Sequence, residues 1–202
     1  MQYKVKIISS KQELHTCSRF EVRHGLWGTD TFPQTYGYLG FVPGEGFYLS
    51  MTCLEKDPYT ACHVQQGSVC KDSAMEFFLQ CFEAKENPDI YLNIEFNSAG
   101  IMHAKYGSSR SGRTPLPLEG EDALVWASHK EDDSWSEEVF LPLSLLEKLY
   151  PGITFEQGSR FRCNFYKISE TPAIEHYAAY APLPVPKPDF HLPEFFAEAI
   201  LV

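Results

Sequence analysis

The chain has 202 residues and an ordinary globular composition, with 44% hydrophobic and 22% charged residues. This length allows one substantial core, so we expect a single domain over residues 1–202. The formal net charge of −10 argues against nucleic acid and against an anionic membrane surface as partners, because basic clusters bind both. A neutral ligand is compatible with this charge.

The N-terminal sequence MQYKVKIISSKQ has no apolar segment typical of a signal peptide, and no stretch has the length of a membrane span. The six cysteines show neither a CxxC motif nor the Cys/His spacing of a zinc site. We therefore expect reduced, mostly buried cysteines in a cytoplasmic protein.

Strand patterns dominate the chain. Alternation with period two, or a β-rich apolar run, predicts strands at 2–7, 46–54, 74–82, 90–97, 123–129, 134–143, 159–168 and 195–202. Gly- and Pro-rich segments separate them, and 106–122 reads as a long loop of the kind that is often functional or mobile. Only 143–150 has a helical pattern. These features predict an all-β fold, an antiparallel β-sandwich of jelly-roll or immunoglobulin-like type with one short helix.

Two of these strands have a polar face rich in amides, charged groups and tyrosine. Their polar positions are Tyr91, Asn93, Glu95 and Asn97 in the first strand, and Arg160, Arg162, Asn164 and Tyr166 in the second. If both faces lie on one sheet, they form a concave polar platform suited to a sugar, because planar polar groups bind hydroxyls and aromatic rings stack on the pyranose. The same alternation also fits a sheet face that is merely solvated.

Four stretches resemble the family 9 carbohydrate-binding modules in order and spacing, and more closely the stand-alone bacterial family 9-like proteins. They are GSVCKDSAMEFFLQ (67–80), YLNIEFNSAG (91–100), FRCNFYKI (161–168) and HYAAYAPLPVPKPDFHLPEFFAEAILV (176–202). With 46–61, the resemblance extends over about 20–202. It implies a DOMON-like β-sandwich that binds a mono- or oligosaccharide without catalysis or cofactor, in glycan degradation beside glycoside hydrolases.

The resemblance and the two polar faces together give a set of candidate site residues. By resemblance, the carboxylate after the DS element is Glu76, the polar position of the next strand is Asn93, and the C-terminal aromatic plate is Phe190. We expect Asn93 to line a depression that the 180–192 segment closes. The full candidate set is Glu76, Asn93, Glu95, Arg162, Asn164, Tyr180, Phe190 and His191.

The chain departs from the family pattern at several positions. The first aromatic plate of the family falls on Cys70, which cannot stack on a sugar, so we expect weak binding or a replacement ring from Trp27 or Tyr106. Tyr180 stands where relatives have tryptophan. Leu192 and Ala197 replace a usual arginine and glycine. The identity of the sugar does not follow from the sequence.

Two other functions are compatible with the same residues. Glu76 and Glu95 could be the acid and nucleophile of a glycosidase, provided that they face each other across a cleft. Alternatively, the scaffold could have lost sugar affinity and serve as an interaction domain, with an exposed apolar patch in place of a polar cleft. The seven histidines show no HExxH motif. Some relatives hold structural calcium, but the acidic segments 119–122 and 130–138 lack the D-x-D-x-D-G pattern.

Overall fold

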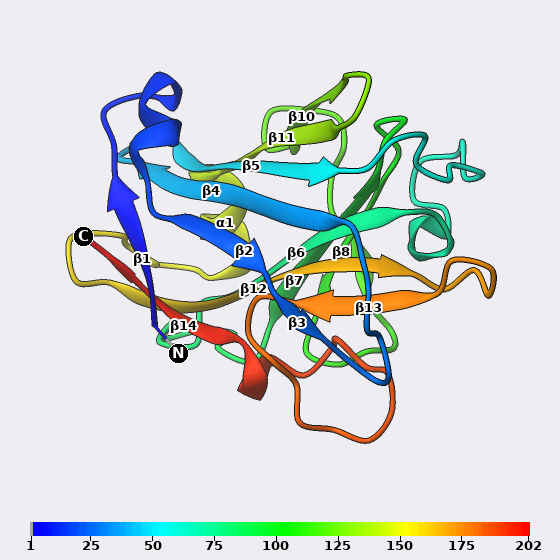
Figure 1. Ribbon diagram of the computed structural model, residues 1–202. Helices are drawn as coiled ribbons and strands as arrows, with labels where there is room; N and C mark the ends of the chain where they lie inside the picture. The colour runs from blue at the N-terminus through cyan, green and yellow to red at the C-terminus, as the bar shows by residue number, and fades with distance from the viewer. Residues whose placement is uncertain (1) are drawn as a thin grey trace.

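The structure is a computed structural model that describes residues 2–202, and it consists almost entirely of β-strands (Figure 1). The strands are β1 (Gln2–Ile7), β2 (Arg19–Val22), β3 (His24–Gly25), β4 (Gln34–Val42), β5 (Gly46–Leu54), β6 (Ala74–Gln80), β7 (Tyr91–Asn97), β8 (Met102–Gly107), β9 (Thr114–Pro115), β10 (Val125–Lys130), β11 (Trp135–Pro142), β12 (Arg160–Ser169), β13 (His176–Ala179) and β14 (Ala197–Leu201). The helices are α1 (Leu143–Leu149) and three 3-10 turns, η1 (Lys11–Thr16), η2 (Val69–Lys71) and η3 (Pro193–Phe195).

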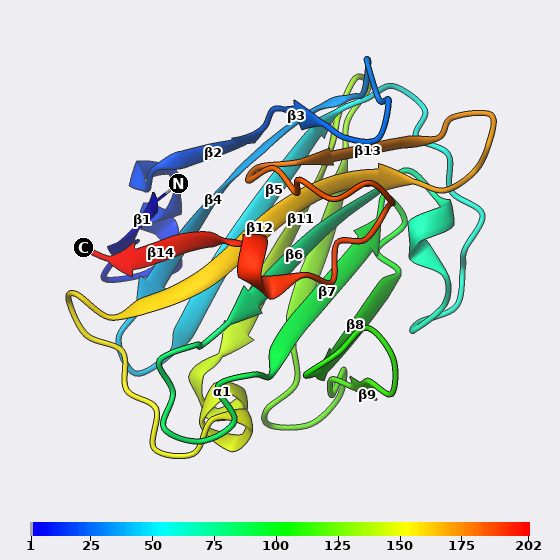
Figure 2. The same cartoon turned by 90° about the horizontal axis from the view of Figure 1, so that it is seen from below.

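The strands form two layers that face each other, as expected for the predicted β-sandwich (Figure 2). One layer has the order β10-β11-β5-β4, with β2 beside β4. The other has the order β14-β12-β6-β7-β8-β9, and β13 and β3 continue from the second half of β12. The apolar side chains between the layers form the main core, which contains large aromatic rings such as Trp135, Phe77 and Phe165.

The sheet is mixed rather than purely antiparallel, which corrects the sequence prediction. Strand β1 pairs parallel to β14 through residues 2–5 and parallel to β4 through residues 6–7, so it crosses from one layer to the other. Neither neighbour is joined to β1 by a hairpin, so no short connection forces an antiparallel direction. The pairing places the first and last strands of the chain side by side (Figure 1).

The expected short helix is confirmed as α1, with Leu145, Leu146 and Leu149 buried. Strand β4 was not predicted because glycines interrupt its apolar pattern. Its Gly37 is needed for packing, since a Cβ there would lie 2.1 Å from the Ser50 carbonyl oxygen and 2.5 Å from the Phe20 ring. No helix among residues 2–202 is long and apolar enough to cross a membrane.

All six cysteines lie in the described range and are free. Four are buried, and the half-buried ones are Cys62 and Cys70. Both half-buried cysteines pack against a second apolar cluster, which lies on the outer face of the layer that contains β6, β7 and β12.

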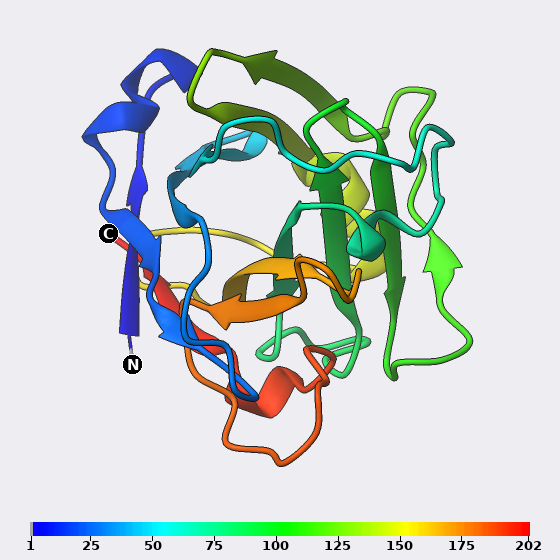
Figure 3. The same ribbon diagram turned by 45° about the vertical axis from the view of Figure 1, so that its right-hand side comes forward.

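This outer face is covered by two chain segments and is therefore not solvated. The segment 55–73, with η2, covers one end of it, and the segment 181–196, with η3, covers the other (Figures 2 and 3). The polar residues of β7 that alternate along this face are all at most 7% exposed. The alternation thus identifies a buried polar face.

Candidate functional site

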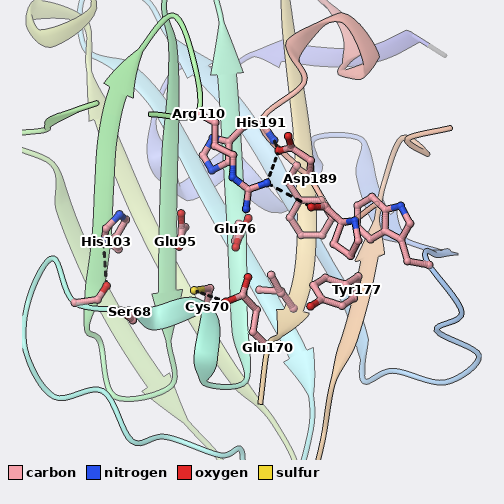
Figure 4. Close-up of a pocket in the computed structure, with 15 residues that line it drawn as sticks. Ser68, Cys70, Glu76, Glu95, His103, Arg110, Glu170, Tyr177, Asp189 and His191 are labelled. Atoms are coloured by element: carbon pink, nitrogen blue, oxygen red, sulfur yellow. Dashed lines mark hydrogen bonds and ion pairs between the residues drawn. The ribbon is translucent and has the colours of Figure 1, made fainter. Parts of the chain in front are cut away.

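A pocket of about 220 Å³ opens on this face, between the two covering segments (Figure 4). Its floor is formed by strands β6, β7 and β8, and its walls come from η2, β13 and the loops at 110 and 188–191. Of the sequence-predicted residues, the pocket contains Glu76, Glu95, Phe190 and His191. The volume lies below the roughly 300–1,000 Å³ of a drug-sized ligand pocket, so it suits a small ligand.

Two glutamates form the centre of the floor. Glu76 of β6 and Glu95 of β7 are directly paired across the antiparallel ladder, and their carboxyls lie side by side in Figure 4. They are 3% and 7% exposed. Directly paired residues have Cβ atoms about 4.5–5.5 Å apart, so the two carboxyl groups repel each other when both are ionised.

The buried position perturbs both carboxyls in the same direction. Burial, with repulsion from Glu95 and Glu170, raises the pKa of Glu76 well above its usual range, and Arg110 opposes this shift. Burial also raises the pKa of Glu95, against the effects of His103 and of a hydrogen bond from Asn93. A carboxyl pair of this kind holds a proton more tightly than isolated glutamates do.

An aromatic wall stands beside the carboxyl floor. Phe190 stacks on Tyr166 with ring centroids 4.0 Å apart, and Trp27 lies 5.5 Å from both the Phe190 and the Tyr177 rings. Trp27, Tyr177 and Phe190 all line the pocket. The indole N–H of Trp27 donates to the Val185 carbonyl oxygen at 2.7 Å, which fixes the ring.

The rim of the pocket joins two loops through an ion pair. The Arg110 guanidinium is 3.1 Å from the Asp189 carboxylate and also donates to the Pro188 carbonyl oxygen. Below it, His191 Nδ1 is hydrogen-bonded to the Tyr91 hydroxyl at 3.1 Å. Burial lowers the pKa of His191 to about 4, so this imidazole is neutral at pH 7.

Asn93 does not line the pocket, which corrects the expectation that it would. Its amide N–H donates to the Glu95 carboxylate at 2.8 Å, and its amide oxygen accepts from Arg113 Nε at 2.9 Å. Arg113 also donates to the Tyr91 carbonyl oxygen and lies over the Tyr91 ring. Both sides of the Asn93 amide are occupied, so this residue orients Glu95 instead of meeting a ligand.

Three further predicted residues lie away from the pocket. Asn164 is fully buried, and its amide bonds the backbone of Ala181 through both its oxygen and its nitrogen, each at 2.9 Å. Arg162 lies nearer the start of β12, over the Phe82 ring. Tyr180 packs against the main core on the opposite face of the sheet. The structure therefore does not bring these three candidate residues to the pocket.

The pocket contains an alternative to the missing aromatic plate. Cys70 lines the pocket as the family resemblance implies, and its thiol donates to the Glu170 carboxylate at 3.4 Å. Of the two candidate replacement rings, Trp27 lines the pocket, whereas Tyr106 packs against the main core.

Sequence reasoning missed Arg110 of the pocket. The only signal for this residue was the unusual length of the loop that carries it.

The arrangement of the carboxyl pair differs from the one that the glycosidase hypothesis requires, in which the two face each other across a cleft. A glycosidase needs two carboxyls that flank the scissile bond, whereas Glu76 and Glu95 are neighbours on one floor and approach a ligand from the same side. Residues 2–202 also contain no group of three or more His, Cys, Asp or Glu side chains that could hold a metal ion, so no such cluster supports the structural calcium that some relatives hold.

Comparison with known proteins gives one family match and several similar structures. The model of carbohydrate-binding family 9 matches residues 43–201. A proposed carbohydrate-binding protein from Bacteroides uniformis ATCC 8492 is 18% identical, with a TM-score of 0.81 over 100% of this chain and 99% of that one. No curated protein matches the sequence.

A family 9 carbohydrate-binding module from Caldicellulosiruptor kristjanssonii has a similar structure in two complexes. The cellotriose complex has a TM-score of 0.71 at 11% identity, covering 100% of this chain and 93% of the module. The glucose complex has a TM-score of 0.70 at 11% identity, covering 100% and 96%. At these identities the likeness shows the β-sandwich fold.

Proposed function

The chain belongs to carbohydrate-binding family 9, and from this premise we propose that it binds a sugar in the pocket between Glu76, Glu95 and the ring of Phe190. The observation that carries the proposal is the pairing of a buried carboxyl floor with an aromatic wall in one small pocket. Carboxylates accept hydrogen bonds from sugar hydroxyls, and an aromatic ring covers the apolar face of the pyranose.

The energetics require such a convergent arrangement. A neutral hydrogen bond to a sugar hydroxyl contributes only about 0.5–1.5 kcal/mol because water is displaced, whereas one to a charged partner contributes about 1.5–3 kcal/mol. Glu76 and Glu95 supply charged acceptors when ionised, and burial strengthens such contacts. The fixed rings of Trp27 and Phe190 contribute contact area without further ordering on binding.

We further propose that the protein performs no catalysis. The side-by-side carboxyls support this proposal because they lie on one floor and do not face each other across a cleft. The polar pocket also favours sugar binding over the interaction-domain alternative, which requires an apolar surface at this place. A cytoplasmic location and a place in glycan degradation, with an imported sugar or a glycan of the cell as ligand, stay predictions of the sequence.

Isothermal titration calorimetry with a panel of mono- and oligosaccharides, glucose and cellotriose included, tests this function. We expect saturable binding that Glu76→Ala and Phe190→Leu weaken at least tenfold, since each removes a main contact (about 1.4 kcal/mol per tenfold change). Arg162→Ala is the matched control, because Arg162 lies on a neighbouring strand outside the pocket. A folded protein that binds no sugar, or equal losses in the control, would contradict the proposal.

A further inference from the structure

The pocket has an excess of acidic groups that the protein itself does not neutralise. Glu76, Glu95, Glu170 and Asp189 line it, and the one arginine among the lining residues, Arg110, is ion-paired with Asp189. This pairing leaves three glutamates facing the pocket.

Glu76 differs from its neighbours because it has no hydrogen-bond donor of its own. Within residues 2–202, no side chain or backbone N–H donates to its carboxyl group, although the residue is only 3% exposed. Glu95 is held by Asn93, and Glu170 by the Cys70 thiol. A buried carboxyl that lacks a protein donor costs stability, and its position in the floor of an open pocket leaves its donors to water or to a ligand.

The other basic group of the floor does not serve Glu76. His103 pairs with Glu95 across β7 and β8, and its Nδ1 is 3.0 Å and 2.9 Å from the carbonyl oxygens of Gln66 and Gly67. The imidazole is therefore held toward the backbone. Glu95 lies between it and Glu76 (Figure 4). Among residues 2–202, Arg110 is the one Lys or Arg that lines this pocket, and it is paired with Asp189.

From this arrangement we infer that the pocket selects an amino sugar, whose free ammonium group lies over Glu76 and Glu170 while its ring contacts Phe190 and Trp27. The inference rests on the proposed function and names the class of sugar. An ammonium donates up to three hydrogen bonds and accepts none, so it satisfies carboxyl acceptors that a hydroxyl would satisfy more weakly. A bare metal ion is disfavoured, since residues 2–202 offer no cluster of three ligating side chains.

Calorimetric titration of amino sugars against their parent sugars tests the inference. The pairs are glucosamine with glucose, and galactosamine with galactose, at about pH 6.5, where an amine of ordinary pKa is protonated. We expect at least one amino sugar to bind about tenfold more tightly than its parent, because charged hydrogen bonds are roughly twice as strong as neutral ones. N-acetylglucosamine, which has no charge, should not show the gain.

Two variants connect the preference to the floor of the pocket. Glu76→Gln should remove most of the preference for the amino sugar while leaving binding of the parent sugar measurable. Glu138→Gln is the matched control, since Glu138 lies in the other layer and pairs with Lys11. Raising the salt concentration should reduce the preference, since the attraction is between charges.

The outcomes separate the inference from the proposed function. Equal affinity for every amino sugar and its parent would overturn the inference and leave sugar binding intact. A folded protein that binds neither kind of sugar would overturn both. A preference that persists in Glu76→Gln would also overturn the inference, because the ammonium would then lie elsewhere.

Discussion

Replacing Glu76 with glutamine is expected to weaken sugar binding and, at the same time, to stabilise the protein. The substitution keeps the shape of the side chain and removes its charge. In the native fold this carboxyl is buried, repelled by Glu95 and Glu170, and without a donor among residues 2–202. A buried charge with these properties destabilises the fold, so its presence is explained by a role in ligand binding.

The size of the binding effect follows from the hydrogen bonds that are lost. The amide oxygen can still accept a hydrogen bond from a sugar hydroxyl, so the loss is the difference between a charged and a neutral bond, about 1–1.5 kcal/mol per contact. This corresponds to an affinity about 5- to 12-fold weaker. Glu76→Ala removes the acceptor altogether and should cost about 10- to 150-fold.

The sign of the stability effect follows from the raised pKa of Glu76. A carboxyl whose pKa is higher in the folded than in the unfolded protein lowers the free energy of unfolding as pH rises above its unfolded pKa of about 4.3. Glutamine cannot ionise, so the variant should gain stability relative to the wild type as pH rises. Its new amide N–H can also donate to Glu95, which lies directly opposite.

Two measurements check this prediction together: calorimetric titration with the tightest-binding sugar of the panel, and thermal unfolding at pH 5 and pH 8 without sugar. We expect weaker binding in the variant and a difference in melting temperature that favours the variant more at pH 8. A variant that is less stable than the wild type at pH 8 would refute the reasoning, since Glu76 would then support the fold.

Three further predictions concern residues around and away from the pocket. Glu137 is buried on the core face of β11 without a hydrogen-bond partner among residues 2–202, and burial raises its pKa from 4.5 to about 8. Its ionisation therefore lowers the free energy of unfolding from pH 4.5 up to pH 8, by about 3 kcal/mol at pH 7. Chemical denaturation should show that Glu137→Gln abolishes this pH dependence without changing sugar affinity. Arg113→Met removes the donor that holds the Asn93 amide, so titration should show weaker sugar binding through a less well oriented Glu95, and unchanged affinity would contradict this positioning role. Asn164→Ala breaks the buried bonds to Ala181, and thermal unfolding should show a loss of about 1–3 kcal/mol; full stability would show that the segment after β13 is held by other contacts.

The sequence predicted which strand faces are polar more reliably than it predicted what the polar groups do. Period-two alternation groups Asn93 with Glu95 on one strand face and Asn164 with Tyr166 on another, and the structure brings both faces, with Glu76, to one side of the sheet. Their roles differ because of contacts made by distant segments. Asn164 holds the chain at Ala181, Asn93 is occupied by Arg113, and only the glutamates face the pocket.

The residues that sequence reasoning missed come from loops whose positions depend on tertiary packing. Arg110 reaches the pocket because its loop folds back to pair with Asp189, 79 residues later. Trp27 reaches it through a hydrogen bond to Val185. Tyr180 was misplaced because β13, which ends just before it at Ala179, was not predicted as a strand, so its side chain could not be assigned to a face. The local periodicity of a sequence cannot predict such contacts between distant segments.

Mapping amide chemical-shift changes in the 1H–15N spectrum during a sugar titration tests the central claim most directly, because it shows both that a sugar binds and where. With the panel sugar of highest affinity, we predict saturable shifts concentrated at residues 67–70, at Glu76 and Glu95, and at 188–191, which surround the pocket. The outer face of β4, β5 and β11 should remain unchanged. Shifts confined to that outer face, or an unchanged spectrum with every sugar of the panel, would contradict the account.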